Sequence, residues 1–101
     1  PLGIILNELI TNSYKYSLPQ EQEIIIQVSI HEVSKGDYQL QYYDNGPGLQ
    51  SNIDFKTVKT LGLKLIKGLA RQLGGGATYH FDQGSHFTIN FKELFLRKKN
   101  S

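Results

Sequence analysis

Hydrophobic residues near the start of the chain recur at the spacing of an α-helix, and Pro19 bars continuation of this helix beyond Leu18. A second helix is predicted at about residues 60–73, where the apolar spacing is again helical and the glycines at 74–76 end it. The apolar positions are Leu2, Ile5, Leu6, Leu9, Ile10 and Tyr16 in the first helix and Leu63, Ile66, Ala70 and Leu73 in the second.

Elsewhere the apolar period changes to two, which is typical of half-buried β-strands. A first strand is predicted over residues 23–30 and a second over residues 38–43, joined through a turn at residues 35–37. A final hairpin covers residues 77–91 and turns at residues 82–85. The apolar faces consist of Ile24, Ile26, Val28 and Ile30; Tyr38, Leu40 and Tyr42; Ala77, Tyr79 and Phe81; and Phe87, Ile89 and Phe91.

The order of these elements predicts the fold class. A helix and two strands are followed by a long loop over residues 45–58, then by the second helix and the final hairpin. This order favours an α+β protein, a two-layer α/β sandwich with its helices on one face of a mixed, mostly antiparallel sheet. At 101 residues the chain has the length of a single domain.

Composition narrows the classes of function. The chain has a net charge of +2 with scattered basic residues, so no nucleic-acid partner is expected. It contains no cysteine, which excludes disulfides, thiolate metal sites and a cysteine nucleophile and fits a reducing, cytoplasmic location. No apolar run reaches the length of a membrane span, so we expect no direct membrane contact.

A polar stripe follows one face of the first helix. Glu8, Asn12 and Lys15 are spaced i, i+4 and i+7 and fall within about 60° of arc around the helix. A carboxylate, an amide and an ammonium there could serve as a base, a magnesium ligand and a phosphate partner. The alternative is the solvent face of an amphipathic helix, and the stripe alone favours that alternative.

Glycine-rich segments follow at three places. Residues 44–48, Asp-Asn-Gly-Pro-Gly, end the second strand, where Asp44 is a hydrogen-bond acceptor and the glycines allow close approach of a ligand. Residues 60–63, Thr-Leu-Gly-Leu, begin the second helix, where free backbone N–H groups suit a phosphate. Residues 84–87 are Gly-Ser-His-Phe. Taken singly, these segments are also explained as a tight turn, a helix cap and a hairpin turn.

The histidines have ordinary structural explanations. His31 lies at the end of the first predicted strand, and His80 and His86 fall on the outward phase of the final hairpin. Three dispersed histidines make no metal constellation.

The four segments in their order resemble the sequence boxes of bacterial sensor histidine kinases, within the GHKL (Bergerat) ATPase superfamily. Residues 6–16 resemble the N box, and residues 44–48, 60–63 and 84–87 resemble the three glycine boxes. The Asn-Glu-Leu sequence at 7–9 and the short lid are similar to the short-lid "NEL…TN" subgroup. The match spans almost the whole chain, as an ATP-binding domain over residues 1–93 followed by a basic tail over 94–101.

The resemblance implies ATP and Mg²⁺ as ligands and a role for each polar residue. Asn12 would coordinate the Mg²⁺ that bridges the triphosphate, and Lys15 would approach phosphate. Asp44 would accept a hydrogen bond from the adenine amino group. Glu8 occupies the place where related ATPases carry their general base.

The glycines would shape the same pocket. Gly46 and Gly48 would form its wall, Gly62 would offer its backbone N–H to phosphate, and Gly84 would let the last hairpin turn beneath the adenine. Thr60 departs from the family pattern, because many relatives have a glycine there.

The chain begins inside the first box, so we expect it to lack the family's preceding helix, edge strand and phospho-accepting histidine hairpin. The implied partners are a histidine-bearing dimerisation domain of the same protein and a downstream response regulator. An unpaired edge would favour edge pairing or a swapped homodimer. Two alternatives stay open, namely a non-catalytic ATP-sensing or pseudokinase module and a serine kinase acting on an anti-sigma partner.

Overall fold

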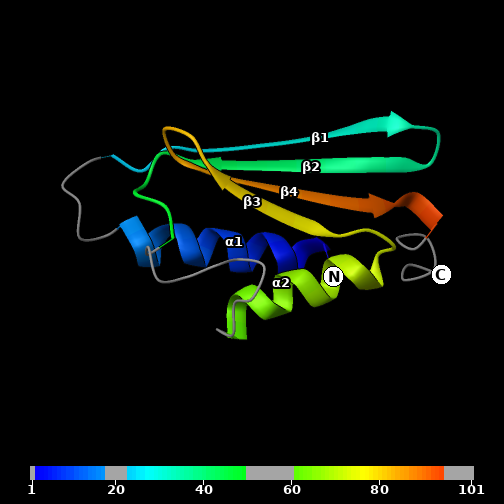
Figure 1. The fold of residues 1–101 in the computed structure, drawn as a ribbon, viewed down its shortest axis with the longest axis horizontal. Coiled ribbons are helices and arrows are strands. Elements are labelled where there is room, and N and C mark those ends of the chain that lie inside the picture. Colours follow the sequence, from blue (N-terminus) through cyan, green and yellow to red (C-terminus); the bar gives the residue numbers. More distant parts are fainter. Residues whose placement is uncertain (1, 18–22, 50–60, 95–101) are drawn as a thin grey trace.

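Two helices pack against one face of a four-stranded sheet in the computed structural model, which describes residues 2–17, 23–49 and 61–94 (Figure 1). The predicted two-layer α+β architecture is therefore confirmed. Most of the predicted long loop, Thr60 and most of the basic tail lie outside the described residues. The elements in chain order are α1 (Leu2–Ser17), β1 (Ile26–Ser34), β2 (Asp37–Asp44), α2 (Leu61–Gln72), β3 (Ala77–Phe81) and β4 (Ser85–Lys92).

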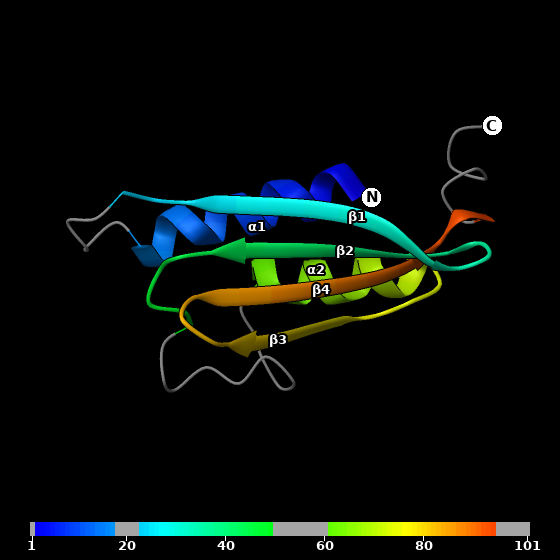
Figure 2. The ribbon, with the colours of Figure 1, turned by 90° about the horizontal axis from the view of Figure 1, so that it is seen from above.

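The strands lie in the order β1-β2-β4-β3, and every pairing among them is antiparallel (Figure 2). Both predicted hairpins are confirmed, because β1 pairs with β2 and β3 pairs with β4. Strand β4 lies between β3 and β2, so Phe87 is opposite both Tyr79 and Tyr42. This register joins the two hairpins into one sheet and brings the turn between β3 and β4 to the end of β2.

The core lies between the helices and the inward face of the sheet. The helix residues buried in this core all belong to the predicted apolar rows, since helical spacing collects them into one stripe. Ile10 of the first predicted row is an exception, because it is 39% exposed. The buried hydrophobic residues are Ile5 and Leu9 of α1; Leu63, Ile66 and Ala70 of α2, with Leu73 directly after it; Leu40 and Tyr42 of β2; and Phe87, Ile89 and Phe91 of β4.

Strand β1 differs from its prediction. It begins at Ile26 rather than residue 23 and continues to Ser34. Val28 and Ile30 pair with Tyr42 and Leu40 and therefore point toward the helix side, but they are 46% and 49% exposed. The reason is that β1 is an edge strand of the described sheet, and the helices do not pack closely enough to bury its apolar row.

No helix among residues 2–17, 23–49 and 61–94 combines the length and apolar character needed to cross a membrane.

Candidate functional site

Four chain segments meet at one end of the molecule. The last turns of α1, the end of β2, the beginning of α2 and the turn between β3 and β4 lie toward the left in Figure 1. Three of these segments carry the candidate residues of the glycine boxes, and α1 carries Glu8, Asn12 and Lys15. The fold therefore gathers the predicted site residues from distant parts of the sequence.

Asp44 is the buried carboxylate of this end, with only 5% of its surface exposed. Its Oδ2 accepts a hydrogen bond of 2.6 Å from the Ser13 hydroxyl of α1, and its Oδ1 accepts one of 2.9 Å from the Gly46 backbone N–H. An ionised carboxylate has about four lone-pair positions, so these bonds leave acceptor capacity on both oxygens. Asp44 is thus held in place and can still accept a donor from a ligand.

Ser13 is itself held by the neighbouring residue on β2. Its hydroxyl oxygen lies 2.6 Å from the hydroxyl of Tyr42 and 3.2 Å from the Leu9 carbonyl one turn earlier in α1. Burial raises the pKa of the Tyr42 hydroxyl, which therefore stays protonated and can donate. A chain of hydrogen bonds then runs from Tyr42 through Ser13 to Asp44. It fixes the carboxylate relative to both α1 and the sheet.

Gly84 lies directly against Asp44. Its φ of +139° is a backbone conformation that glycine adopts readily, and a Cβ at this position would overlap the Asp44 carbonyl oxygen and the Tyr43 ring. Tyr43 also donates a 2.9 Å hydrogen bond from its hydroxyl to the Gln83 carbonyl. The hairpin turn therefore packs on the end of β2 at a position where only glycine fits.

Gly48, at the end of the 44–48 segment, is a second position that requires glycine. Its φ is +83°, and a Cβ would come within 2.7 Å of the Phe81 ring and 2.8 Å of the Tyr79 hydroxyl. The same hydroxyl accepts a 3.1 Å hydrogen bond from the Leu49 backbone N–H. These contacts attach the loop to β3, and Gly46 is buried within it.

A second group of polar residues joins α1 to α2. Glu8 and Asn12 are half-buried, and a Cβ on Gly62 would lie 2.8 Å from Glu8 Oε2 and 4.0 Å from Asn12 Oδ1. Asn12 Nδ2 is buried and has no hydrogen-bond partner among the described residues. Lys15 is exposed in the last turn of α1. The structure thus brings Glu8, Asn12 and Gly62 together and leaves Lys15 at the surface.

Residues 1–94 match the family model described as "Histidine kinase-, DNA gyrase B-, and HSP90-like ATPase". The chain belongs to this family. It is an ATP-binding domain of the type that these ATPases share.

Solved structures with the same fold include several histidine kinases. The histidine kinase domain of a blue-light activated histidine kinase from Erythrobacter litoralis has a TM-score of 0.82 at 17% identity, covering 96% of this chain and 45% of that one. The Acinetobacter baumannii histidine kinase AdeS has a TM-score of 0.66 at 29% identity, over 90% and 45%. Full-length ShkA in complex with AMPPNP has a TM-score of 0.71 at 21% identity, over 89% and 21%.

The chain spans less than half the length of each of these proteins. A search of curated protein sequences found no match.

Three residues of this ATPase domain that contribute to the site were missed from the sequence. The sequence places Ser13 in a helix and Tyr42 and Tyr79 on strand faces, and it gives none of them a role in the site. A signal was present for Ser13, which continues the buried row of Ile5 and Leu9 at four-residue spacing. A serine at a core position needs a polar partner, and Asp44 is that partner.

Proposed function

We propose that this ATPase domain is the catalytic domain of a sensor histidine kinase, and that the whole protein transfers the γ-phosphoryl group of ATP to a histidine on a separate dimerisation domain. The fold shared with the histidine kinases from Erythrobacter litoralis and Acinetobacter baumannii supports this choice among the family's activities. The phosphohistidine would then supply a downstream response regulator.

One observation carries the proposal. Consecutive residues of α1 face two different polar groups. Ser13 binds the buried Asp44, and Asn12 lies beside Gly62 with an amide nitrogen that has no hydrogen-bond partner among the described residues. A nucleotide has the same two requirements, an acceptor for its base and polar groups for its phosphates. The family match and the AMPPNP complex of ShkA agree with ATP as the ligand.

Asp44 serves the adenine in this proposal. Its carboxylate accepts the exocyclic amine, and Ser13 and Gly46 keep the two oxygens oriented before the nucleotide arrives. Because the group is already ordered and desolvated, little reorganisation accompanies binding. Gly84 and Gly48 let the hairpin turn and the 44–48 loop approach closely enough to form the pocket wall, to which the buried Gly46 also contributes.

Asn12 and Glu8 serve the phosphate end. Asn12 fits a magnesium ligand, because its buried amide nitrogen lacks a partner in the described part of the chain and the amide oxygen and nitrogen occupy interchangeable positions. Hard cations such as Mg²⁺ prefer the oxygen. Bound Mg²⁺ supplies neutralisation of the phosphate charge. Glu8 takes a proton from the acceptor imidazole as a general base, Lys15 contacts phosphate, and Gly62 offers its backbone N–H at the start of α2.

The test uses the full-length protein with [γ-³²P]ATP and Mg²⁺. We expect acid-labile label on the protein, at least a tenfold loss of labelling in Asn12→Ala, and little change in Asn90→Ala, which removes an exposed amide on β4. Glu8→Gln should lower the rate of labelling more than the affinity for ATP. Binding of ATP without label would support a nucleotide sensor instead, and acid-stable label on a partner serine would support a serine kinase.

We also infer that the edge of β1 allows two copies of the chain to associate. Strand β1 is at the edge of the described sheet, and Val28 and Ile30 add an exposed apolar row. Light scattering at rising concentration should show a dimer that Ile30→Lys reduces. A strict monomer at high concentration would contradict the inference.

A further inference from the structure

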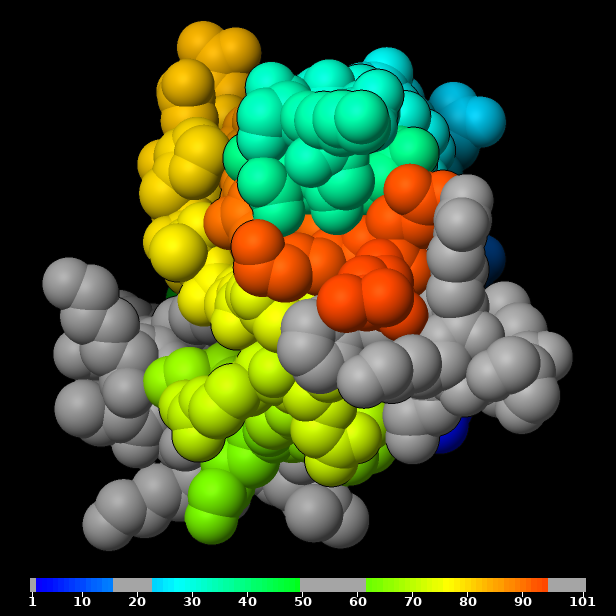
Figure 3. Space-filling view, turned by 90° about the vertical axis from the view of Figure 1, so that its right-hand side faces the viewer, coloured from blue at the N-terminus to red at the C-terminus, as the bar shows by residue number. Residues whose placement is uncertain are grey.

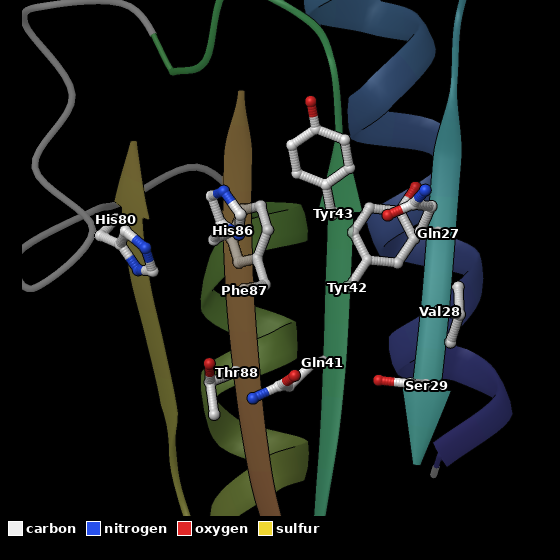
Figure 4. A pocket seen from close by; sticks show the side chains of 10 residues that line it. All are labelled: Gln27, Val28, Ser29, Gln41, Tyr42, Tyr43, His80, His86, Phe87 and Thr88. Atoms are coloured by element: carbon white, nitrogen blue, oxygen red, sulfur yellow. The ribbon is translucent and has the colours of Figure 1, made fainter. Parts of the chain in front are cut away.

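The outward face of the sheet carries a pair of histidines in ring contact. His80 of β3 is directly opposite His86 of β4, and their ring centroids are 4.6 Å apart with the planes inclined by 6°. Figure 4 shows the two rings projecting from neighbouring strands on the side away from the helices. The sequence had presented these residues as dispersed, and the hairpin register brings them together.

A backbone contact fixes the hydrogen position on His86. Its Nε2 lies 3.0 Å from the Asp82 carbonyl oxygen, and because a carbonyl can only accept, Nε2 must carry the hydrogen. In the neutral ring, Nδ1 then keeps its lone pair. Histidines that bind metals usually donate their other N–H to a carbonyl or carboxylate in this way. His86 is therefore oriented as a ligand through Nδ1.

The space beside the pair is open, and several polar side chains contribute to its lining. Both histidines line a groove of about 390 Å³, together with Tyr43 and with polar side chains such as Gln41 and Thr88 (Figure 4). An ion bound at the histidines would have room for coordinated water in this groove. The exposed His80 can turn its ring out of the stack without disturbing the core.

We propose that His80 and His86 form a binding site for a divalent transition metal ion such as Cu²⁺, Ni²⁺ or Zn²⁺. Imidazole nitrogen suits these ions, and two metal–nitrogen bonds of about 2.0–2.1 Å require the two nitrogens to lie within about 4 Å of each other. The ring centroids are 4.6 Å apart, and because an imidazole binds a metal in its own plane, the His80 ring turns out of the stack to bring its nitrogen to the ion. Water completes the coordination. Across residues 2–17, 23–49 and 61–94 no three His, Cys, Asp or Glu side chains are grouped to hold an ion, so the site is an open one.

The ion would cross-link β3 and β4 at the His80–His86 pair. One further cross-strand pair separates these histidines from the turn that packs on Asp44. A ligand that binds only the folded state raises the free energy of unfolding by RT ln(1 + [L]/Kd), so stability rises with ligand concentration. Metal binding should therefore raise the melting temperature of the chain. This inference stands apart from the nucleotide site and needs no ATP.

The test titrates the metal-free chain with Cu²⁺, Ni²⁺ and Zn²⁺ by calorimetry and records the melting temperature with and without excess metal, in the absence of nucleotide. We expect one ion per chain, tighter binding of Cu²⁺ than of Ni²⁺, and reversal by EDTA. His80→Asn should weaken binding at least tenfold and remove the rise in melting temperature. It leaves the bond from His86 to Asp82 intact.

The matched control is His31→Asn, which removes an exposed histidine on β1. Its affinity should equal that of the unaltered chain. His86→Asn should weaken binding as much as His80→Asn. Unchanged affinity in the His80→Asn, His86→Asn double variant, or an equal loss in His31→Asn, would overturn the proposal.

Discussion

Strand β2 begins and ends with an aspartate, and the two carboxylates have opposite surroundings. Asp44 at the end of the strand is 5% exposed and accepts hydrogen bonds from Ser13 and a backbone N–H. Asp37 at the start has a side chain that is 43% exposed, accepts a hydrogen bond from Ser34 and pairs with Lys92 at 2.9 Å. The residue type is the same, so the difference comes from what packs against each end.

The end that carries Asp44 is covered by α1 and by the turn containing Gly84. At the other end, the turn between β1 and β2 lies beside the end of β4, as Figure 3 shows in blue-green next to orange. There the Glu93 backbone N–H donates to the Gly36 carbonyl at 3.0 Å. A helix and a hairpin turn exclude water from one carboxylate, whereas the other stays in solvent and is neutralised by a lysine. Of the two carboxylates, Asp44 is therefore the one suited to hold a ligand, because it is buried and retains acceptor capacity.

Substituting Asp44 and Asp37 in turn should give the largest difference in ATP affinity and in stability. Asp44→Ala should lower ATP affinity about ten- to a hundredfold, since a hydrogen bond to a charged group contributes about 1.5–3 kcal/mol. It should also destabilise the fold by about 1–3 kcal/mol, because Ser13, which links Asp44 to Tyr42, loses its buried acceptor. Calorimetric titration with ATP and denaturant unfolding measure the two effects. Asp37→Ala is the matched control, and an equal loss of affinity there would remove the distinction.

The glycines beside the two aspartates provide the next comparison. Gly84 and Gly36 both have positive φ, at +139° and +80°, but a Cβ on Gly84 meets the Asp44 backbone and one on Gly36 meets nothing within 4 Å. Gly84→Ala should cost about 1–3 kcal/mol from backbone strain, with steric overlap in addition. Gly36→Ala should cost only the strain of a left-handed residue, about 1–2 kcal/mol. Thermal unfolding of both variants shows which one loses more stability. A larger loss of stability in Gly36→Ala would contradict the prediction.

The helices, the strands and most of the core could be predicted from the sequence. The spacing of apolar residues and the positions of glycines are local signals, so they can be read without the fold. The helical rows of Leu63, Ile66 and Ala70 and the alternation of Tyr38, Leu40 and Tyr42 match the structure. The exposure of Val28 and Ile30 was not predictable, since it depends on which neighbours cover an edge strand.

The candidate site was predictable as a set of residues and not as a network. The order of the boxes selected Asp44, Asn12 and the glycines as candidates, and the fold brings most of these candidates together. The contact between Ser13 and Asp44 joins residues 31 positions apart, and no local pattern encodes it. The stacking of His80 on His86 likewise depends on the register of a hairpin.

Ser13 and Ser34 donate hydrogen bonds to the two aspartates. The losses of stability on replacing these serines should differ by less than the losses on replacing the two glycines. Ser13→Ala should cost about 1–2 kcal/mol, because it leaves Tyr42 and Asp44 without their shared partner in a buried place. Ser34→Ala should change stability little, since water replaces the lost donor to the exposed Asp37. A double-mutant cycle between Ser13→Ala and Tyr42→Phe should be non-additive, as expected for one network. Additive losses would indicate that the two hydroxyls act independently.

The smallest effect on stability is expected from breaking the ion pair between Asp37 and Lys92. The hydrogen bond from Lys92, with help from Ser34, holds the pKa of the Asp37 carboxyl below its usual value of 3.8. A group whose pKa is lowered on folding adds stability above its unfolded pKa and loses it as pH falls through the folded pKa. Lys92→Ala should therefore lower the melting temperature slightly at pH 7 and low salt, less in high salt, and not at all once Asp37 is protonated. A loss that persists at such low pH would have to come from packing of the lysine stem, and charge pairing at this end of β2 would then contribute nothing to the contrast with Asp44.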